Sequence, residues 1–248
     1  MSSIRALTIA LALAGVAVTA SAEQARIAVA ANFSAPMKAI IAAYEADSGH
    51  KIQASYGSTG KLYAQIVNGA PYDVFLAADR DRPERLEREG RAQSGSRFTY
   101  ALGRLVLWSA DPRRVDPAGR VLVDSGVGRL AIANPELAPY GRAAKETLRD
   151  LGAWETLAPR LLRGENVAQA FLFTASGGAE LGLVSRAQVL LTADSVSGSS
   201  WLVPAHHHAP IEQQAVRLTD AEGAAEWLSF LTSEEGRVVI ADYGYDLP

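Results

Sequence analysis

The sequence predicts an α/β fold. Short apolar runs alternate with amphipathic helical patterns along most of the 248 residues, and this alternation is typical of parallel βα units. Glycines, which commonly end helices, directly follow several of the helical patterns. Without its amino-terminal apolar run, the chain has the length for one large domain or for two lobes of about 100 residues each.

The first 22 residues predict a signal peptide. Arg5 precedes an apolar run over residues 6–20, and residues 20–22 (ASA) supply a small-x-small cleavage pattern. The run is shorter than the about 20 apolar residues that a membrane-spanning helix needs. We therefore expect an exported protein whose mature chain begins at Glu23, with an uncleaved amino-terminal anchor as the alternative.

Two strand-to-helix units are predicted at the start of the mature chain. Residues 26–31 form the first predicted strand, and the helix after it has Pro36 in its first turn, where proline is tolerated. Apolar residues in this helix recur at i, i+3, i+4 and i+7, so one face packs onto the sheet, and Gly49 ends the helix. A second strand over residues 51–56 leads into a helix over residues 61–68.

Further elements follow from alternation and from helix caps. Ile52, Ala54 and Tyr56 alternate onto one face of the second strand. Residues 219–222 (TDAE) predict a capping box that opens a helix through Leu231. The other predicted elements are strands over residues 74–77, 105–109, 130–133 and 181–184, helices over residues 142–151 and 168–174, and a last helix capped by Ser233 that ends near Gly244.

Composition excludes several classes of site. The chain contains no cysteine, which excludes thiol catalysis, cysteine metal sites and a disulfide framework. Its 24 Lys+Arg and 27 Asp+Glu residues give a formal net charge of −3. Because the charges are interspersed and no basic stretch stands out, we expect no nucleic-acid partner.

Three strand-to-helix turns carry candidate binding groups. They are residues 32–34 (NFS), 57–60 (GSTG) and 164–167 (GENV). Ligands of open α/β sheets bind at the carboxyl ends of strands, where helix N-termini present unpaired N–H groups that favour an anion. One such turn alone is more often a helix cap, so only convergence of several would indicate an anion site.

Other motifs do not develop into sites. The GSTGK stretch lacks the glycine and the Ser or Thr of a nucleotide-binding P-loop, because Ser55 and Leu62 occupy those positions. The three consecutive histidines at 206–208 have no partners at metal-ligand spacing, which favours a solvated loop over adventitious metal binding. No nucleophile elbow or zinc-protease motif occurs, so we expect a protein that is not an enzyme.

Five segments together resemble the bacterial periplasmic molybdate-binding proteins, in the same order along the mature chain. They are residues 30–37 (AANFSAPM), 56–62 (YGSTGKL), 69–79 (GAPYDVFLAAD), 130–135 (LAIANP) with 138–141 (APYG), and 151–157 (LGAWETL). The resemblance implies a two-lobed type II periplasmic binding fold, each lobe a mostly parallel sheet flanked by helices. The implied boundaries are residues 1–22 for the signal peptide, 23–101 and 205–248 for lobe 1, and 102–204 for lobe 2.

The resemblance also implies a ligand site between the lobes. Proteins of this family hold the anion with hydroxyls and backbone amides and with no charged partner. Some members carry a serine where this chain has Asn32, and a tyrosine where it has Ser185. The molybdate-binding positions carried over to this sequence are Asn32, Ser58, Thr59, Tyr140, the backbone of Val167, and Ser185.

The implied function is capture of molybdate, and also of tungstate, in the periplasm. The partners would be the membrane permease and ATPase subunits of an ABC importer, which receive the ligand. The protein itself is expected to be a monomer, with no cofactor and no site for a free metal cation. Molybdate has lost both protons at neutral pH, so a pocket lined by donors matches it. A sulfate- or other oxyanion-binding protein, a periplasmic hydrolase, and a signalling or adhesion module with the same fold are the alternatives.

Overall fold

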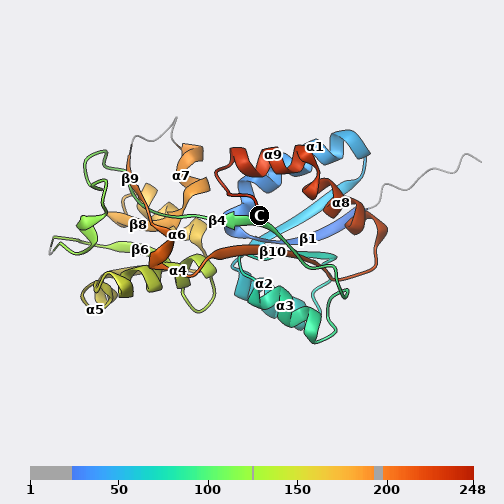
Figure 1. The fold of residues 1–248 in the computed structure, drawn as a ribbon, viewed down its shortest axis with the longest axis horizontal. Helices are drawn as coiled ribbons and strands as arrows, with labels where there is room; N and C mark the ends of the chain where they lie inside the picture. The colour runs from blue at the N-terminus through green and yellow to red at the C-terminus, as the bar shows by residue number, and fades with distance from the viewer. Residues whose placement is uncertain (1–23, 125, 193–197) are drawn as a thin grey trace, which may run out of the picture.

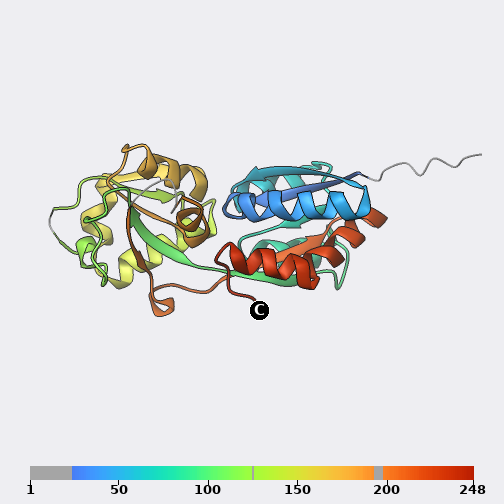
Figure 2. The same cartoon turned by 90° about the horizontal axis from the view of Figure 1, so that it is seen from above.

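The computed structural model describes residues 24–124, 126–192 and 198–248, so the predicted signal peptide lies outside the described residues. Two five-stranded sheets lie side by side, each with helices on its faces (Figures 1 and 2). The predicted α/β fold with two lobes is therefore confirmed. No helix in the described ranges is both long and apolar enough to cross a membrane.

The first sheet has the strand order β2-β1-β3-β10-β4. β1 runs parallel to β2 and β3, whereas β10 runs antiparallel to β3 and β4, so one strand opposes the other four. The strands are β1 (Gln24–Ala30), β2 (Lys51–Gly57), β3 (Val74–Leu76), β4 (Phe98–Gly103) and β10 (Ile211–Arg217). One face is covered by α1 (Ser34–Ser48), α8 (Glu222–Thr232) and α9 (Glu234–Asp242), and the other by α2 (Thr59–Val67) and α3 (Asp81–Arg88), as Figure 1 shows.

The second sheet repeats this plan with the order β7-β6-β8-β5-β9. Here β5 is the reversed strand, antiparallel to β8 and β9. The strands are β5 (Leu105–Ser109), β6 (Leu130–Ala133), β7 (Leu161–Gly164), β8 (Leu181–Ser185) and β9 (Ser199–Leu202). The helices are α4 (Pro139–Asp150), α5 (Trp154–Leu157), α6 (Val167–Ala175) and α7 (Arg186–Thr192).

The chain crosses between the two sheets twice. Only Arg104 separates β4 from β5, and a segment that contains the 3₁₀ turn Ala205–His207 leads from β9 back to β10. The carboxyl terminus lies at this junction in both views (Figures 1 and 2). There Asp246 pairs its backbone with Leu102, and its carboxylate lies 2.8 Å from Arg104 Nη1. The crossing region is thus braced by the last residues of the chain.

Local signals placed most of the helix ends correctly. Met37, Ile40 and Tyr44 are buried on the predicted face of α1, and Gly49 ends this helix with φ 72°, a left-handed conformation that glycine adopts without strain. The Ser233 hydroxyl accepts a hydrogen bond from Gly236 N, which confirms the predicted cap of α9.

One local prediction was wrong. Thr219 does not open a capping box, because α8 begins at Glu222 with Ala221 at its N-cap, and no side chain caps it. The Thr219 hydroxyl instead donates to Asp73 Oδ1 at 3.1 Å, since that buried carboxylate needs donors. Tyr56 is 39% exposed, and its strand β2 lies at the edge of its sheet.

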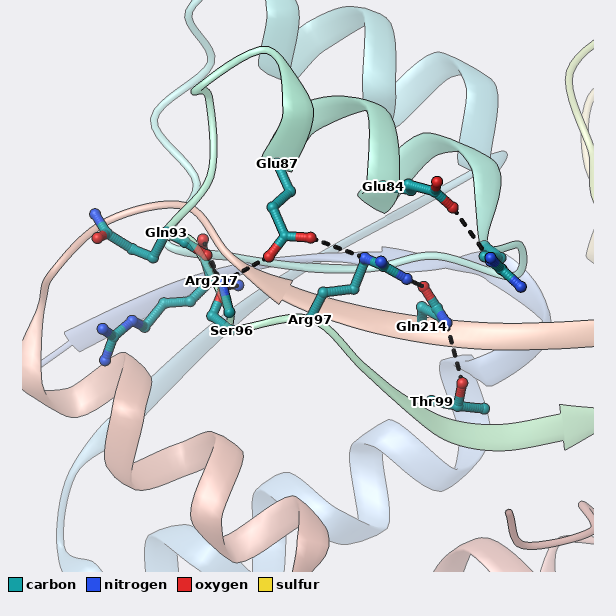
Figure 3. Close-up of polar contacts among 10 residues, drawn as sticks. Glu84, Glu87, Gln93, Ser96, Arg97, Thr99, Gln214 and Arg217 are labelled. Atoms are coloured by element: carbon teal, nitrogen blue, oxygen red, sulfur yellow. Dashed lines mark hydrogen bonds and ion pairs between the residues drawn. The ribbon is translucent and has the colours of Figure 1, made fainter.

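A chain of polar side chains fastens β10 to its neighbours (Figure 3). Arg97 lies 3.0 Å from Glu87 of α3 and donates to Gln214 Oε1 at 2.8 Å. Gln214 in turn donates to Thr99 Oγ1 of β4 at 3.1 Å. These contacts connect the returning strand β10 to β4 and α3 of the first lobe.

We predict that Ser233→Ala lowers the free energy of unfolding by about 1 kcal/mol, because it removes the N-cap acceptor of α9. Urea unfolding measures the change. Ser229→Ala, which alters an exposed hydroxyl inside α8, is the matched control and should change stability by no more than about 0.5 kcal/mol. Equal losses in the two variants would show that the cap does not stabilise the helix.

Candidate functional site

A cavity lies between the two lobes, at the carboxyl ends of strands from both sheets. Its empty volume is about 190 Å³, including the part open to solvent. The lining residues carry no charge in the described part of the chain. They are Ala30, Ala31, Asn32, Gly57, Ser58, Thr59 and Ala78 from the first lobe and Ala138, Pro139, Tyr140, Asn166 and Val167 from the second.

The three turns singled out in the sequence converge on this cavity. Five of the six predicted positions line it: Asn32, Ser58, Thr59, Tyr140 and Val167. Ser185 is not among the lining residues. It lies fully buried at the end of β8, where its hydroxyl donates to Gln188 Oε1 at 2.9 Å. The geometry therefore assembles the predicted set without Ser185.

Ser58 and Thr59 present two hydroxyls with different roles. The helix predicted over residues 61–68 begins two residues earlier, at Thr59, so Ser58 occupies its N-cap. Thr59 Oγ1 accepts a hydrogen bond from Ala78 N at 3.1 Å. Ser58 is only 2% exposed, and its hydroxyl has no hydrogen-bond partner among the described residues. Because a hydroxyl that accepts still has its own hydrogen to donate, both Ser58 and Thr59 can donate to a ligand from the first lobe.

Helix N-termini add backbone donors from both lobes. α2 begins at Thr59 on one side of the cavity, and α6 begins at Val167 on the other. The Asn166 side chain accepts from Gln169 N at 3.1 Å and so caps one N–H of α6. The first N–H groups of a helix have no partner inside it, and the helix dipole places positive partial charge there. The Val167 amide is such a group.

Asn32 has its side-chain donors already engaged. Its Nδ2 atom donates to Gln213 Oε1 at 2.7 Å and to Tyr245 Oη at 3.1 Å. Since an amide nitrogen carries two hydrogens, neither remains for a ligand. Asn32 can therefore offer only its backbone N–H to the cavity, while its side chain joins a buried polar network behind the site.

This network was not predicted from the sequence. Tyr245 Oη donates to the Asn32 carbonyl at 2.7 Å, and Tyr100 Oη donates to Gln213 Oε1 at 3.2 Å. Tyr100 is the extra residue of a bulge in β4, where the pairing with β10 shifts between Gln213 and Gln214. Bulges commonly redirect a side chain beside a functional site. A glutamine inside a buried strand was the only sequence signal of this arrangement.

Tyr140 reaches the cavity from the start of α4. Burial raises the pKa of Tyr140 well above 10, and the nearby Tyr245 and Tyr100 raise it further, so its hydroxyl remains protonated. Among the described residues this hydroxyl makes no hydrogen bond of standard geometry, although Tyr245 and the Arg104 backbone are its polar neighbours. Tyr140 is thus a second buried hydroxyl that can donate to a ligand, and it comes from the opposite lobe.

The lobes touch around the cavity mouth. Gly60 N donates to Leu137 O at 2.8 Å, and Lys61 Nζ lies 3.1 Å from Glu165 Oε1. Ala30 and Ala78 of the first lobe pack into the apolar core of the second. The lobes therefore contact each other beside the cavity, where the lower local dielectric strengthens hydrogen bonds to a charged ligand.

The histidine triplet lies in the second crossing segment, away from the cavity lining. His206 is exposed, and His207 Nδ1 lies 2.6 Å from Asp150 Oδ2. Within the described ranges, no group of three or more His, Cys, Asp or Glu side chains could hold a metal ion.

Comparison with known proteins gives a consistent result. Residues 25–246 match the family model of the bacterial extracellular solute-binding proteins. The molybdate-binding protein ModA of Azotobacter vinelandii is 47% identical over 99% of this chain and 98% of its own length. ModA of Rhodobacter capsulatus is also 47% identical, over 98% of this chain and 96% of its own.

Solved structures agree with the sequence relatives. The Azotobacter vinelandii periplasmic molybdate-binding protein superimposes with a TM-score of 0.87 and 42% identity, covering 90% of this chain and 99% of that one. The sulfate-binding protein SubI of Mycobacterium tuberculosis has a TM-score of 0.75 at 14% identity, covering 90% and 86% of the two chains. At that identity the second match shows the fold alone.

Three buried tyrosines, Tyr100, Tyr140 and Tyr245, predict a loss of stability in alkali. Burial raises the pKa of each above 10, the value in the unfolded chain. The folded protein then holds protons that the unfolded chain releases, so stability is complete below about pH 10 and falls as the pH rises further. Urea unfolding between about pH 8 and 11.5 measures this decline. In Tyr100→Phe the free energy of unfolding should decline less steeply with pH. An unchanged slope would show that ionisation of Tyr100 does not contribute to the decline.

Proposed function

Because the chain belongs to the family of bacterial extracellular solute-binding proteins, with molybdate-binding proteins as near relatives, we propose that it captures molybdate between its two lobes. The observation that carries this proposal is the pair of buried hydroxyls of Ser58 and Tyr140, neither with a hydrogen bond of standard geometry among the described residues, which line one uncharged cavity from opposite lobes. The protein acts as a periplasmic monomer without enzymatic activity and delivers the anion to the permease and ATPase subunits of an ABC importer.

The donor set suits a fully deprotonated tetrahedral oxyanion. Every oxygen of molybdate or tungstate accepts hydrogen bonds and none donates, so hydroxyls and backbone N–H groups are the matching partners. Phosphate usually keeps a proton, which a lining carboxylate would have to accept. The nearest carboxylate in sequence, Glu165, is held by Lys61 at the surface and does not line the cavity. Tungstate, with the same charge and shape, is the second expected ligand.

Hydrogen bonds and helix dipoles replace a counter-cation in this site. Hydrogen bonds to a charged group contribute about 1.5–3 kcal/mol each, roughly twice the value of neutral ones. Ser58, Tyr140 and the Val167 amide supply three such bonds, and the N-termini of α2 and α6 place positive partial charge beside the anion. Together these terms offset the loss of the anion's hydration.

The two lobes supply the binding mechanism. The anion first meets the donors of lobe 1, at residues 23–101 and 205–248, and lobe 2, at residues 102–204, then closes over it. Closure brings Tyr140 and Val167 onto the anion and excludes water. The bending would occur where the chain crosses between the sheets, at Arg104 and at the segment between β9 and β10.

Isothermal titration calorimetry with molybdate, tungstate, sulfate and phosphate tests the proposal. We expect molybdate and tungstate to bind at least about 100-fold more tightly than the other two anions, a difference of about 2.8 kcal/mol. Equal or tighter binding of sulfate would replace molybdate with sulfate as the ligand. If none of the four anions binds, the oxyanion site itself is refuted.

Single substitutions test which hydroxyls hold the anion. Ser58→Ala, Thr59→Ala and Tyr140→Phe should each raise the molybdate Kd, by about 10- to 100-fold for Ser58→Ala and Tyr140→Phe, because each of these two removes one bond to a charged ligand. Ser229→Ala, on the exposed side of α8, controls for nonspecific effects. Ser185→Ala tests whether Ser185, which the sequence predicted as a contact but which does not line the cavity, binds the anion. A loss of molybdate affinity as large as that of Ser58→Ala would show that it does.

A further inference from the structure

Gly103, the last residue of β4, lies directly beneath Tyr140. A Cβ atom at this position would overlap the Tyr140 hydroxyl oxygen and would lie 3.1 Å from Tyr140 Cζ and 3.0 Å from Ile211 Cγ2. The backbone of Gly103 does not have the positive φ that would itself favour glycine. Room for the Tyr140 hydroxyl is therefore the physical reason for a glycine here.

This contact joins the cavity wall to the crossing strands. Tyr140 belongs to α4 of the second lobe, whereas Gly103 ends the last strand before the first crossing and pairs with Ile211, the first residue of the returning strand. On this side the hydroxyl meets Gly103, the Arg104 backbone and Tyr245, in a fully buried region. On its other side Tyr140 lines the cavity. A Tyr140 hydroxyl displaced from Gly103 would move toward the cavity that Tyr140 lines.

We propose that Gly103 is a specificity-determining residue that acts through the position of Tyr140. By lacking a side chain, it lets the Tyr140 hydroxyl withdraw toward the crossing strands, which leaves the cavity wide enough for molybdate or tungstate. Sulfate has the same charge and tetrahedral shape but is smaller, so only the positions of the donors can separate these anions. This inference rests on the proposed oxyanion function.

A methyl group at position 103 would have to displace the Tyr140 hydroxyl by on the order of 1 Å to reach an ordinary contact distance. The displaced hydroxyl would narrow the cavity and would crowd a large anion more than a small one. One methyl-sized change in a closely fitted pocket commonly alters discrimination by about 10- to 200-fold. Gly103→Ala should therefore change selectivity as well as affinity.

The test is calorimetry of Gly103→Ala with molybdate, tungstate and sulfate. We expect the Kd for molybdate and tungstate to rise at least about tenfold more than the Kd for sulfate. Gly126→Ala is the matched control, because a Cβ at this exposed loop glycine would meet no atom within 4 Å, and it should leave all three constants unchanged. Equal losses for all three anions in Gly103→Ala, or an unchanged ratio, would overturn the proposal.

A double variant separates this role from general damage to the crossing strands. Tyr140→Phe removes the atom that the new methyl group overlaps and leaves the looser contact with Cζ at 3.1 Å, so adding Gly103→Ala to it should change the molybdate-to-sulfate ratio of Tyr140→Phe by much less than about tenfold. A change of about tenfold or more in that ratio would contradict an action through the Tyr140 hydroxyl. The double variant also decides the question if Gly103→Ala alone does not fold. Failure of the native protein to prefer molybdate over sulfate would instead refute the proposed function itself.

Discussion

A buried hydroxyl or amide without a hydrogen-bond partner costs about 1–3 kcal/mol, and the fold of this chain keeps such groups on both sides of one cavity. Ser58 and Tyr140 are almost fully buried and have no standard partner among the described residues. An oxyanion with four accepting oxygens removes this cost, whereas a ligand that must donate would not. The closed cavity therefore selects for charge and protonation state before it selects for size.

Beside the unpaired donors, both side-chain hydrogens of Asn32 are paired. Asn32 is held by Gln213 and Tyr245, so its side chain cannot turn to compete for the ligand. Gln213 lies on the strand that returns between the lobes, and Tyr245 belongs to the carboxyl-terminal segment that braces the same junction. The network thus fixes the first-lobe wall against the crossing strands. Movement of the crossing strands would therefore change the shape of the first-lobe side of the cavity.

Features that depend on contacts within a few residues could be predicted from the sequence, whereas features that depend on contacts between distant residues could not. Gly49, Ser233 and the turn at residues 57–60 act within a few residues, and the expectations drawn from them largely held. Thr59 accepts a hydrogen bond from Ala78 whereas the Ser58 hydroxyl has no partner among the described residues, and this difference depends on a contact 19 residues away that sequence patterns do not resolve. The pairing of Asn32 with residues about 180 and 210 positions away has no local signal, and for the same reason Asp73 draws Thr219 out of its expected cap.

Two kinds of contact hold the lobes together, and their magnitudes differ. The ion pairs across the cavity mouth join side chains that are about half exposed, such as Lys61 with Glu165, and exposed pairs contribute only about 0–1 kcal/mol. In the proposed complex, hydrogen bonds from Ser58, Tyr140 and the Val167 amide to the bound dianion would contribute about 1.5–3 kcal/mol each. Because a ligand shifts a conformational equilibrium only by its differential affinity, the donors that engage on closure, and not the surface ion pairs, determine how strongly binding favours the closed form.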